Sequence, residues 1–227
     1  MTASALAQVL LTRPHMSLVP SCRRVRTSKG AIVTGTILIT GAAGRMGRTL
    51  LHHWQDRVPL GLDRAGADRT VDLTSGPDAC VWAFAGAETV VHLAADPDPI
   101  ASYESGGYGN TLETLTVVGA CLQAGVRRLI FASSVWADAP AWRLADRMTW
   151  YAASKLAGEA LVQAWADQTG NPAVCLRPGF FDPGAGRADG FNEALRVDVP
   201  SLCRHFDEAL AWEGPGCAIR YAVGKLR

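Results

Sequence analysis

Short apolar runs alternate with helical stretches from residue 36 onward. The run at residues 36–40 is β-branched and apolar, which is typical of a strand buried on both faces of a parallel sheet. Two helical stretches end directly before Gly125 and Gly170, because glycine readily adopts the left-handed conformation that closes a helix. Predicted strands cover residues 36–40, 58–62, 89–93, 128–132, 173–176 and 217–222, and predicted helices cover about 45–55, 77–85, 110–124, 151–169 and 200–212.

This alternation predicts an α/β fold, a doubly wound parallel sheet (Rossmann fold) with a minimal C-terminal substrate lobe. The predicted domain covers residues 36–227, with the small lobe at about 180–216. Two stretches, residues 96–109 and 181–199, are rich in coil-forming residues and predict loops. No apolar run reaches the roughly 18 residues that a membrane span requires.

The first 35 residues differ from the rest of the chain. They contain no acidic residue and no clean helical period after Pro14, so we expect a disordered or non-native extension outside the fold. Organelle import is the alternative, because transit peptides have a similar basic, Ser- and Thr-rich composition. The rest of the chain is biased to Ala, Gly, Arg and Asp, which is typical of a GC-rich bacterial gene and favours the extension.

Charge and cysteine content exclude several classes of protein. The 227 residues carry a net charge of +1, and 48% of them are hydrophobic, which excludes a disordered chain and a nucleic-acid binder that acts by bulk charge. Without residues 1–35 the chain has 17 basic and 21 acidic residues, a net charge of about −4. None of the six cysteines forms a CxxC pair, so we expect reduced thiols, no metal site and a cytoplasmic protein.

A glycine-rich turn follows the first predicted strand. Gly41, Gly44 and Gly47 stand three residues apart between a strand and a helix, the context in which such a turn binds a dinucleotide pyrophosphate. Asp63 ends the second predicted strand and can accept hydrogen bonds from an adenosine ribose. Because a carboxylate repels a 2′-phosphate, Asp63 favours NAD over NADP, although the adjacent Arg64 acts in the opposite sense.

Candidate catalytic residues lie further along the chain. Tyr151 and Lys155 are four residues apart and share one helix face, where an ammonium lowers the pKa of a phenol toward that of a general base. Ser134 ends the fourth predicted strand, at the sheet edge where ligands of open α/β sheets bind. Asn110 opens the preceding helix and completes the candidate catalytic set.

Together these motifs resemble the extended short-chain dehydrogenase/reductase superfamily, specifically the NAD-dependent epimerase/dehydratase family. The motifs that carry the resemblance run in family order over residues 36–179. They are ILITGAAGRMG (37–47), Asp63, Asp72-Leu73, VVHLAA (90–95), Asn110-Thr111, LIFASS (129–134), YAASKLAGE (151–159) and LRPG (176–179).

The resemblance implies a role for each matching residue. Ser134, Tyr151 and Lys155 would form the catalytic triad, with Lys155 also bonding the nicotinamide ribose. The dinucleotide would be held by the glycine turn and by residues that follow the strands. These cofactor-binding candidates are Gly41, Gly44, Arg45, Met46, Gly47, Asp63, Asp72, Leu73, Leu93, Ala94, Ala95, Pro178 and Gly179.

Several segments further resemble uronate dehydrogenases and related short sugar oxidoreductases, which oxidise a hexuronic acid at C1 with NAD. By that resemblance Arg187 is the candidate partner of a substrate carboxylate, and an arginine in an ordinary loop is its alternative. Ser134 and Tyr151 are only 17 residues apart, the intervening loop is rich in Trp, and Val135 follows the serine pair. The short loop and tail favour a small substrate.

We therefore expect an NAD-dependent oxidoreductase acting on a small sugar or sugar acid, with Ser134 also contacting the substrate. A nucleotide-sugar epimerase or dehydratase that retains its NAD is the first alternative, and a non-catalytic NAD(P)-binding sensor or scaffold is the second. The expected partner is a small molecule, without nucleic acid or membrane. Related proteins often dimerise through helices that correspond to residues 110–124 and 151–169. The apolar residues there (Leu112, Leu115, Val118 and Leu122) serve either a homodimer or the core, and core packing is the preferred explanation.

Overall fold

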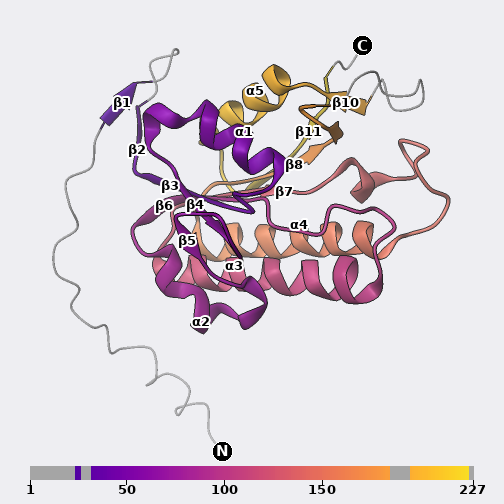
Figure 1. Ribbon diagram of the computed structural model, residues 1–227, viewed down its shortest axis with the longest axis horizontal. Coiled ribbons are helices and arrows are strands. Elements are labelled where there is room, and N and C mark those ends of the chain that lie inside the picture. The colour runs from indigo at the N-terminus through magenta and orange to yellow at the C-terminus, as the bar shows by residue number, and fades with distance from the viewer. Residues whose placement is uncertain (1–23, 27–31, 185–194, 225–227) are drawn as a thin grey trace, which may run out of the picture.

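A seven-stranded parallel sheet forms the centre of the molecule (Figure 1). The computed structural model describes residues 24–26, 32–184 and 195–224. The strand order is β11-β8-β7-β6-β3-β4-β5, and all neighbouring strands run parallel. The strands are β3 (Thr36–Thr40), β4 (Leu60–Asp63), β5 (Arg69–Thr70), β6 (Ala87–His92), β7 (Arg128–Ala132), β8 (Ala173–Pro178) and β11 (Cys217–Ala222).

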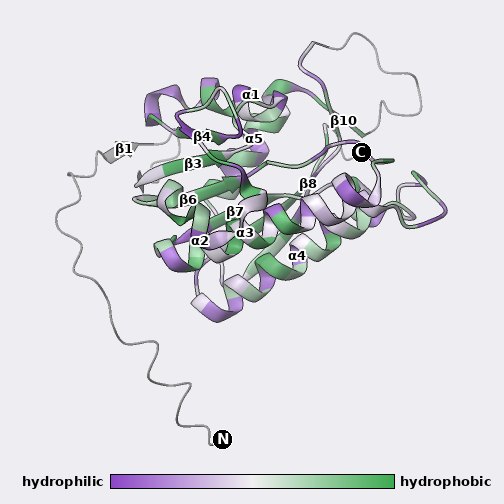
Figure 2. Ribbon diagram, turned by 60° about the horizontal axis from the view of Figure 1, so that its bottom comes forward, coloured by the Kyte–Doolittle hydropathy of each residue, from purple (hydrophilic) through white to green (hydrophobic). Residues whose placement is uncertain are grey.

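Helices cover both faces of this sheet. The short α2 (Pro77–Cys80) and the long α3 (Asn110–Ala124) and α4 (Trp150–Thr169) cover one face, and α1 (Arg45–His53) and α5 (Val199–Leu210) cover the other (Figure 1). Successive strand residues point to opposite layers: Leu38 joins the core beneath α3 and α4, whereas Ile37 and Ile39 join the core beneath α1 and α5. Apolar residues gather along the strands and the inner helix faces (Figure 2). The predicted doubly wound fold is confirmed.

Short elements complete the chain between these layers. Four 3₁₀ turns cover η1 (Gln55–Arg57), η2 (Leu73–Ser75), η3 (Val81–Phe84) and η5 (Val135–Asp138), and a π-helix, η4 (Tyr103–Gly109), leads into α3. Two-residue strands β9 (Phe180–Phe181) and β10 (Arg196–Val197) form a separate parallel pair. Together with α5 and β11 they constitute the small C-terminal part beside the sheet edge.

Several predicted boundaries are wrong for local reasons. Val58 was expected to open the second strand, but it adopts a left-handed conformation (φ 51°) after η1, so β4 begins at Leu60. The helix predicted at residues 77–85 divides into α2 and η3. The stretch at residues 96–109, expected as coil, contains the π-helix, and the helix predicted at residues 200–212 runs from Val199 to Leu210.

Two short strands lie in the segment that we excluded from the domain. β1 (Arg24–Arg26) and β2 (Ile32–Thr34) pair antiparallel and form a sheet of their own, separate from the seven-stranded sheet. The expectation of no regular structure is therefore wrong for these six residues. The domain boundary near residue 36 stays a prediction, and residues 1–23 lie outside the described part of the chain.

Within residues 24–26, 32–184 and 195–224, no helix combines the length and the hydrophobicity that a membrane span requires.

Candidate active site

The glycine turn joins β3 to α1 at the carboxyl edge of the sheet. Gly41 has a positive φ of 68°, and a Cβ there would lie 2.7 Å from the backbone nitrogen of Ala94. A Cβ on Gly47 would lie 2.6 Å from the Cα of Ala42, so glycine is required where α1 packs on the turn. Gly44 is the N-cap of α1 and offers no side chain to its N–H groups, which leaves this helix end suited to an anion.

Asp63 lies directly beside this turn. Its Oδ2 accepts a hydrogen bond from the backbone N–H of Ala43 at 2.9 Å, and its Oδ1 accepts one from Arg64 N–H at 2.7 Å. Each carboxylate oxygen has a second lone pair, so Asp63 retains the capacity to accept from a ribose hydroxyl. The acid at the end of β4 is thus fixed against the glycine turn, as the dinucleotide prediction requires.

The other predicted adenosine residues serve the local fold. Asp72 caps η2, because its Oδ1 accepts from the backbone N–H of Thr74 at 2.9 Å and from the Thr74 hydroxyl at 2.8 Å. These two bonds hold the pKa of Asp72 below its ordinary value. The Leu73 side chain is buried in the core beneath α3. A cavity of about 420 Å³ opens next to the glycine turn, and neither Asp72 nor Leu73 lines it. The predicted residues Asp63, Ala94 and Asn110 do not line it either.

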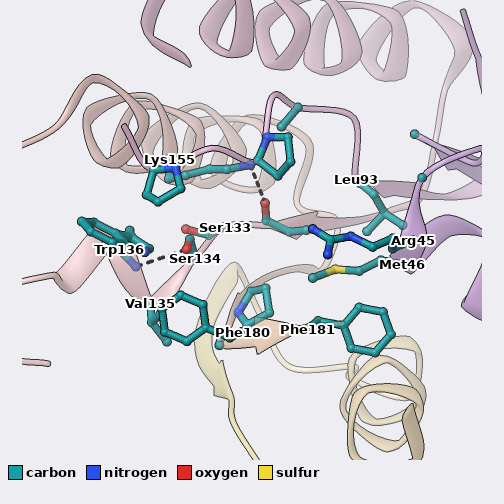
Figure 3. Close-up of a pocket in the computed structure, with 18 of the residues that line it drawn as sticks. Arg45, Met46, Leu93, Ser133, Ser134, Val135, Trp136, Lys155, Phe180 and Phe181 are labelled. Atoms are coloured by element: carbon teal, nitrogen blue, oxygen red, sulfur yellow. Dashed lines mark hydrogen bonds between the residues drawn. The ribbon is translucent and has the colours of Figure 1, made fainter. Parts of the chain in front are cut away.

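This cavity opens between the glycine turn, the end of β7, α4 and the segment after β8 (Figure 3). Twelve predicted residues line it: Gly41, Gly44, Arg45, Met46, Gly47, Leu93, Ala95, Ser134, Tyr151, Lys155, Pro178 and Gly179. It is also lined by residues that the sequence did not single out as a site: Pro97, Pro99, Ala132, Ser133, Val135, Trp136, Phe180, Phe181, Asp182 and Arg196. The sequence offers no periodic signal for these, since most lie in loops and two-residue strands.

Ser134, Tyr151 and Lys155 meet at one side of this cavity. The Ser134 oxygen accepts a hydrogen bond from Trp136 N–H at 3.2 Å, and Ser134 and Tyr151 both line the cavity. The Lys155 Nζ donates to the carbonyl of Ala132 at 3.0 Å and lies 5.5 Å from the centre of the Tyr151 ring (Figure 3). All three side chains are buried, so the sequence prediction that they gather at one place agrees with the structure.

The expected direction of the Tyr151 shift is wrong. Burial raises the pKa of Tyr151 above its ordinary value, the Ser134 hydrogen bond opposes that rise, and the charge of Asp96 adds to it. Burial also lowers the pKa of Lys155 to about 8, against the attraction of Glu113. Desolvation penalises both the Tyr151 phenolate and the Lys155 ammonium. The i, i+4 spacing of the two residues gives no information about how deeply they are buried.

Asn110 was predicted as catalytic, and its contacts place it in a different role. Its Oδ1 accepts from the backbone N–H of Asp96 at 2.7 Å, and its Nδ2 donates to the Asp96 carbonyl at 3.0 Å. Both ends of the amide are therefore bound to the loop that follows β6. Asn110 fixes this loop beside Tyr151 and does not line the cavity.

A buried polar network lies behind the catalytic groups. The Ser133 hydroxyl donates to Glu159 at 2.6 Å, and Glu159 accepts two hydrogen bonds from the Arg177 guanidinium, each 2.8 Å long. Arg177 also donates to the Tyr221 hydroxyl at 3.0 Å, which in turn donates to Asp138 at 2.5 Å. The Glu159 bonds raise the pKa of Arg177, so its charge is fixed. The network joins the loop after β7 to α4, β8, β11 and η5 behind Ser134.

Arg187 was predicted to pair with a carboxylate group of the substrate. It lies in residues 185–194, outside the described residues. Arg196, from β10, lines the cavity, and Arg45 pairs with Asp182 across it at 3.7 Å, with both side chains about half exposed. Basic side chains therefore reach the cavity from both the glycine turn and the C-terminal part.

A family model matches residues 37–194, which run from β3 to beyond β9. The chain belongs to the NAD-dependent epimerase/dehydratase family. The resemblance read from the motifs is thereby confirmed.

One curated relative and two solved structures are similar to this chain. The chain is 34% identical over 169 residues to L-arabinose 1-dehydrogenase (NAD(P)(+)) of Haloferax volcanii, covering 64% of this chain and 66% of that enzyme. It shares its fold with uronate dehydrogenase from Agrobacterium tumefaciens (TM-score 0.70, 20% identity, covering 83% and 76%). The chain also shares its fold with UDP-N-acetylglucosamine 4-epimerase from Bacillus cereus (TM-score 0.64, 18% identity, covering 82% of this chain and 74% of that enzyme).

The match covers only part of the length of each curated relative. The match spans 66% of the arabinose dehydrogenase and between 22% and 42% of three other curated relatives.

Proposed function

We propose that the protein is an NAD-dependent oxidoreductase of the short-chain dehydrogenase type that oxidises a hydroxyl group of a small sugar or sugar acid. The observation that carries this proposal is that Ser134, Tyr151 and Lys155 are buried and line one cavity bordered by the glycine turn, with Tyr151 and Lys155 one helical turn apart. The 34% identity to an arabinose dehydrogenase supports a sugar as the substrate class.

The residues of the glycine turn fit a dinucleotide. Gly41 and Gly47 leave space that a Cβ would fill, the end of α1 carries no side-chain cap, and Asp63 has lone pairs to spare. Bound NAD would supply the nicotinamide carbon that accepts the hydride. Lys155 would hold the nicotinamide ribose, and the remaining cofactor contacts follow the resemblance given above.

The chain's own groups would manage the proton. Ser134 holds the substrate oxygen beside the phenol, and Tyr151 takes the hydroxyl proton as the hydride leaves carbon. Because the pKa of Lys155 is about 8, its ammonium form prevails at neutral pH and stabilises the phenolate that forms. Burial makes that phenolate costly, so we expect oxidation to accelerate as the pH rises above neutral and to slow above about pH 8, where Lys155 loses the charge that stabilises the phenolate.

The wall of the cavity favours a second class of substrate. Outside the catalytic residues much of the lining is apolar, contributed by Pro97, Pro99, Val135, Trp136, Phe180 and Phe181. Such a wall suits a less polar secondary alcohol as well as the face of a sugar ring. Substrate tests should therefore include both classes.

The experiment incubates purified protein with NAD and, separately, pentoses, hexuronic acids, UDP-sugars and apolar secondary alcohols. Continuous NADH release with one of the sugars or sugar acids supports the proposal, and release with an apolar alcohol alone supports the second class. A product epimer without net NADH supports the epimerase, and binding of NAD without turnover supports the sensor.

Replacing Tyr151 by Phe tests the catalytic assignment. We expect kcat to fall by about 10²- to 10⁴-fold, the usual contribution of a general acid–base group, while NAD still binds. Tyr108→Phe is the matched control, because Tyr108 is 57% exposed and does not line the cavity. Equal activity of Tyr151→Phe and wild type would remove every catalytic hypothesis.

The outer face of α3 and α4 supports a homodimer as part of this proposal. Leu115 and Leu122 are 46% and 41% exposed on α3, so they do not serve the core. Sedimentation of the Leu115→Glu variant checks it: we expect a dimer in the wild type and a monomer in the variant.

Of the five cysteines described, all are free and four are buried, which supports a reducing, cytoplasmic location.

A further inference from the structure

One arginine anchors both ends of the segment that follows β7. At its start, the Ser133 hydroxyl donates a hydrogen bond to Glu159 at 2.6 Å. At its end, Asp138 accepts one from the Tyr221 hydroxyl at 2.5 Å. Arg177 donates to both partners, with two bonds of 2.8 Å to Glu159 and one of 3.0 Å to the Tyr221 oxygen. Because the Arg177 side chain is largely buried, both ends of the segment are tied to one fixed charge.

The residues between these two anchors form one wall of the cavity. Ser134, Val135 and Trp136 line it, and Ser134 caps the turn η5 by accepting from the Trp136 N–H. Val135 is fully buried in a small core against which Tyr221 packs. Figure 3 shows Val135 and Trp136 on the Ser134 side of the cavity, with Arg45 at the start of α1 on the opposite side. The wall therefore lies beside the substrate oxygen that Ser134 would hold, and not beside the pyrophosphate.

The position of this wall depends on contacts outside the turn. The element η5 is a single 3₁₀ turn, whose hydrogen bonds have poorer geometry than those of an α-helix, so neighbouring elements decide where it lies. Asp138, its last residue, is partly exposed and is held by the Tyr221 hydroxyl, whereas Arg177 lies 3.7 Å from the same carboxylate, beyond hydrogen-bond distance. Asp138, Tyr221 and Arg177 do not line the cavity, so they affect a ligand only through the wall.

We propose that Tyr221 and Asp138 are positioning residues, whose hydrogen bond holds Val135 and Trp136 against the bound sugar and thereby sets the KM for it. The inference rests on the proposed function, because it requires a sugar beside Ser134. It adds a residue of the edge strand β11 to the determinants of substrate affinity. The anchor at the start of the segment is separate from this bond, so the catalytic hydroxyl keeps its place when the bond is lost.

Initial rates of NADH release test the inference. They are measured on the full chain at saturating NAD, with L-arabinose or with the sugar that reacts fastest in the panel above. Tyr221→Phe removes the hydroxyl and keeps the ring that packs on the small core. We expect KM for the sugar to rise about 3- to 10-fold, as for the loss of one hydrogen bond, with kcat and the dissociation constant for NAD within about twofold of the wild type. An effect on the fold alone would lower the amount of active enzyme, and so kcat, without changing KM.

Two Asp138 variants separate the hydrogen bond from the charge. Asp138→Asn keeps an oxygen that accepts from Tyr221, so its KM should stay within about twofold of the wild type. Asp138→Ala loses the acceptor and should match Tyr221→Phe. The double variant should be no worse than either single change, because the two side chains act through one contact. An Asp138→Asn variant with the same KM as Asp138→Ala overturns the inference, since the charge and not the bond would then matter.

Asn171→Ala is the matched control. The Asn171 amide donates to the Val126 carbonyl at 3.2 Å and precedes β8, at the opposite edge of the sheet from Ser134, so the variant loses one tertiary bond without touching the wall. An unchanged KM in Tyr221→Phe and Asp138→Ala overturns the inference and leaves the proposed function intact, and so does an equal rise in Asn171→Ala. A wild type that releases no NADH with any sugar or sugar acid overturns the proposed function and this inference with it.

Discussion

Burial decides the protonation of the polar side chains beneath the site, and His92 shows this most clearly. It is 1% exposed, its Nδ1 lies 2.8 Å from the Thr40 hydroxyl, its Nε2 lies 3.2 Å from the Thr114 hydroxyl, and its ring stacks on Phe131. Burial, with the nearby Lys155 charge, lowers the pKa of His92 to about 3. The ring is therefore neutral in the folded protein at any pH near neutrality.

This predicts a loss of stability in acid. The unfolded chain binds a proton at His92 near pH 6.5, whereas the folded protein does so only near pH 3, so the free energy of unfolding falls as the pH drops through that window. The contribution of His92 amounts to about 3 kcal/mol by pH 4. Urea unfolding of the wild type and of His92→Gln at pH 7 and pH 4 checks it. Equal losses in the two proteins would contradict the assignment.

At this scale the sequence predicts which side chains meet but not what their surroundings do to them. The i, i+4 spacing and the strand end correctly placed Tyr151, Lys155 and Ser134 together. The shift of Tyr151 had the wrong predicted direction because desolvation arises from residues far apart in the chain.

The turn between β3 and α1 gives the clearest prediction for a single element. In Gly47→Ala the new Cβ would lie 2.6 Å from the Cα of Ala42, which is backbone and cannot move away without shifting the turn. We expect the free energy of unfolding to fall by about 1–3 kcal/mol, as for other overpacked sites, and NAD binding to be lost.

Gly44→Ala serves as the comparison for this prediction. The nearest atom to its new Cβ is the Gly41 carbonyl oxygen at 3.1 Å, so stability should change less than in Gly47→Ala. Urea titration and calorimetry with NAD measure both quantities. Equal destabilisation of the two variants would show that helix propensity, and not the close approach of α1 to the turn, governs these positions.

Long elements were predicted well because each carries its own hydrophobic period. The bounds of β3, β7, α3 and β11 agree with the prediction at both ends. The two-residue strands β5, β9 and β10 were missed, because so few residues have no period and exist only through their register with a neighbouring strand. The cavity lining from Phe180 to Asp182 and Arg196 was missed for the same reason.

The polar network from Ser133 to Asp138 joins distant parts of the molecule. It links residues 133, 138, 159, 177 and 221 from four elements and the loop after β7, and no sequence pattern relates such positions. The order of strands and helices was sufficient to predict the doubly wound class. The side-chain connections across it follow only from the assembled sheet.

Removing one member of this network should be costly. In Arg177→Met the buried Glu159 carboxylate loses its bidentate partner, and breaking such a pair costs about 3–5 kcal/mol. Urea unfolding measures the loss, and a Glu159→Leu change added to Arg177→Met should restore part of it.

The exposed pair of Arg127 and Glu88 provides the control for this prediction. Their side chains are 69% and 36% exposed and lie 3.7 Å apart, so Arg127→Met should cost less than about 1 kcal/mol. A loss of the same small size in Arg177→Met would mean that the Glu159 pair contributes no more than a surface contact.

The strand order also bears on how the chain assembles as it is synthesised. From β6 onward each strand of the sheet pairs with a strand that was made before it: β6 with β3, β7 with β6, β8 with β7 and β11 with β8. Every newly made strand therefore finds its template already in place, and no existing pair has to open to admit it. A growing chain leaving the ribosome can build this sheet outward from β3, first to β4 and β5 and then from β6 to β11 on the other side.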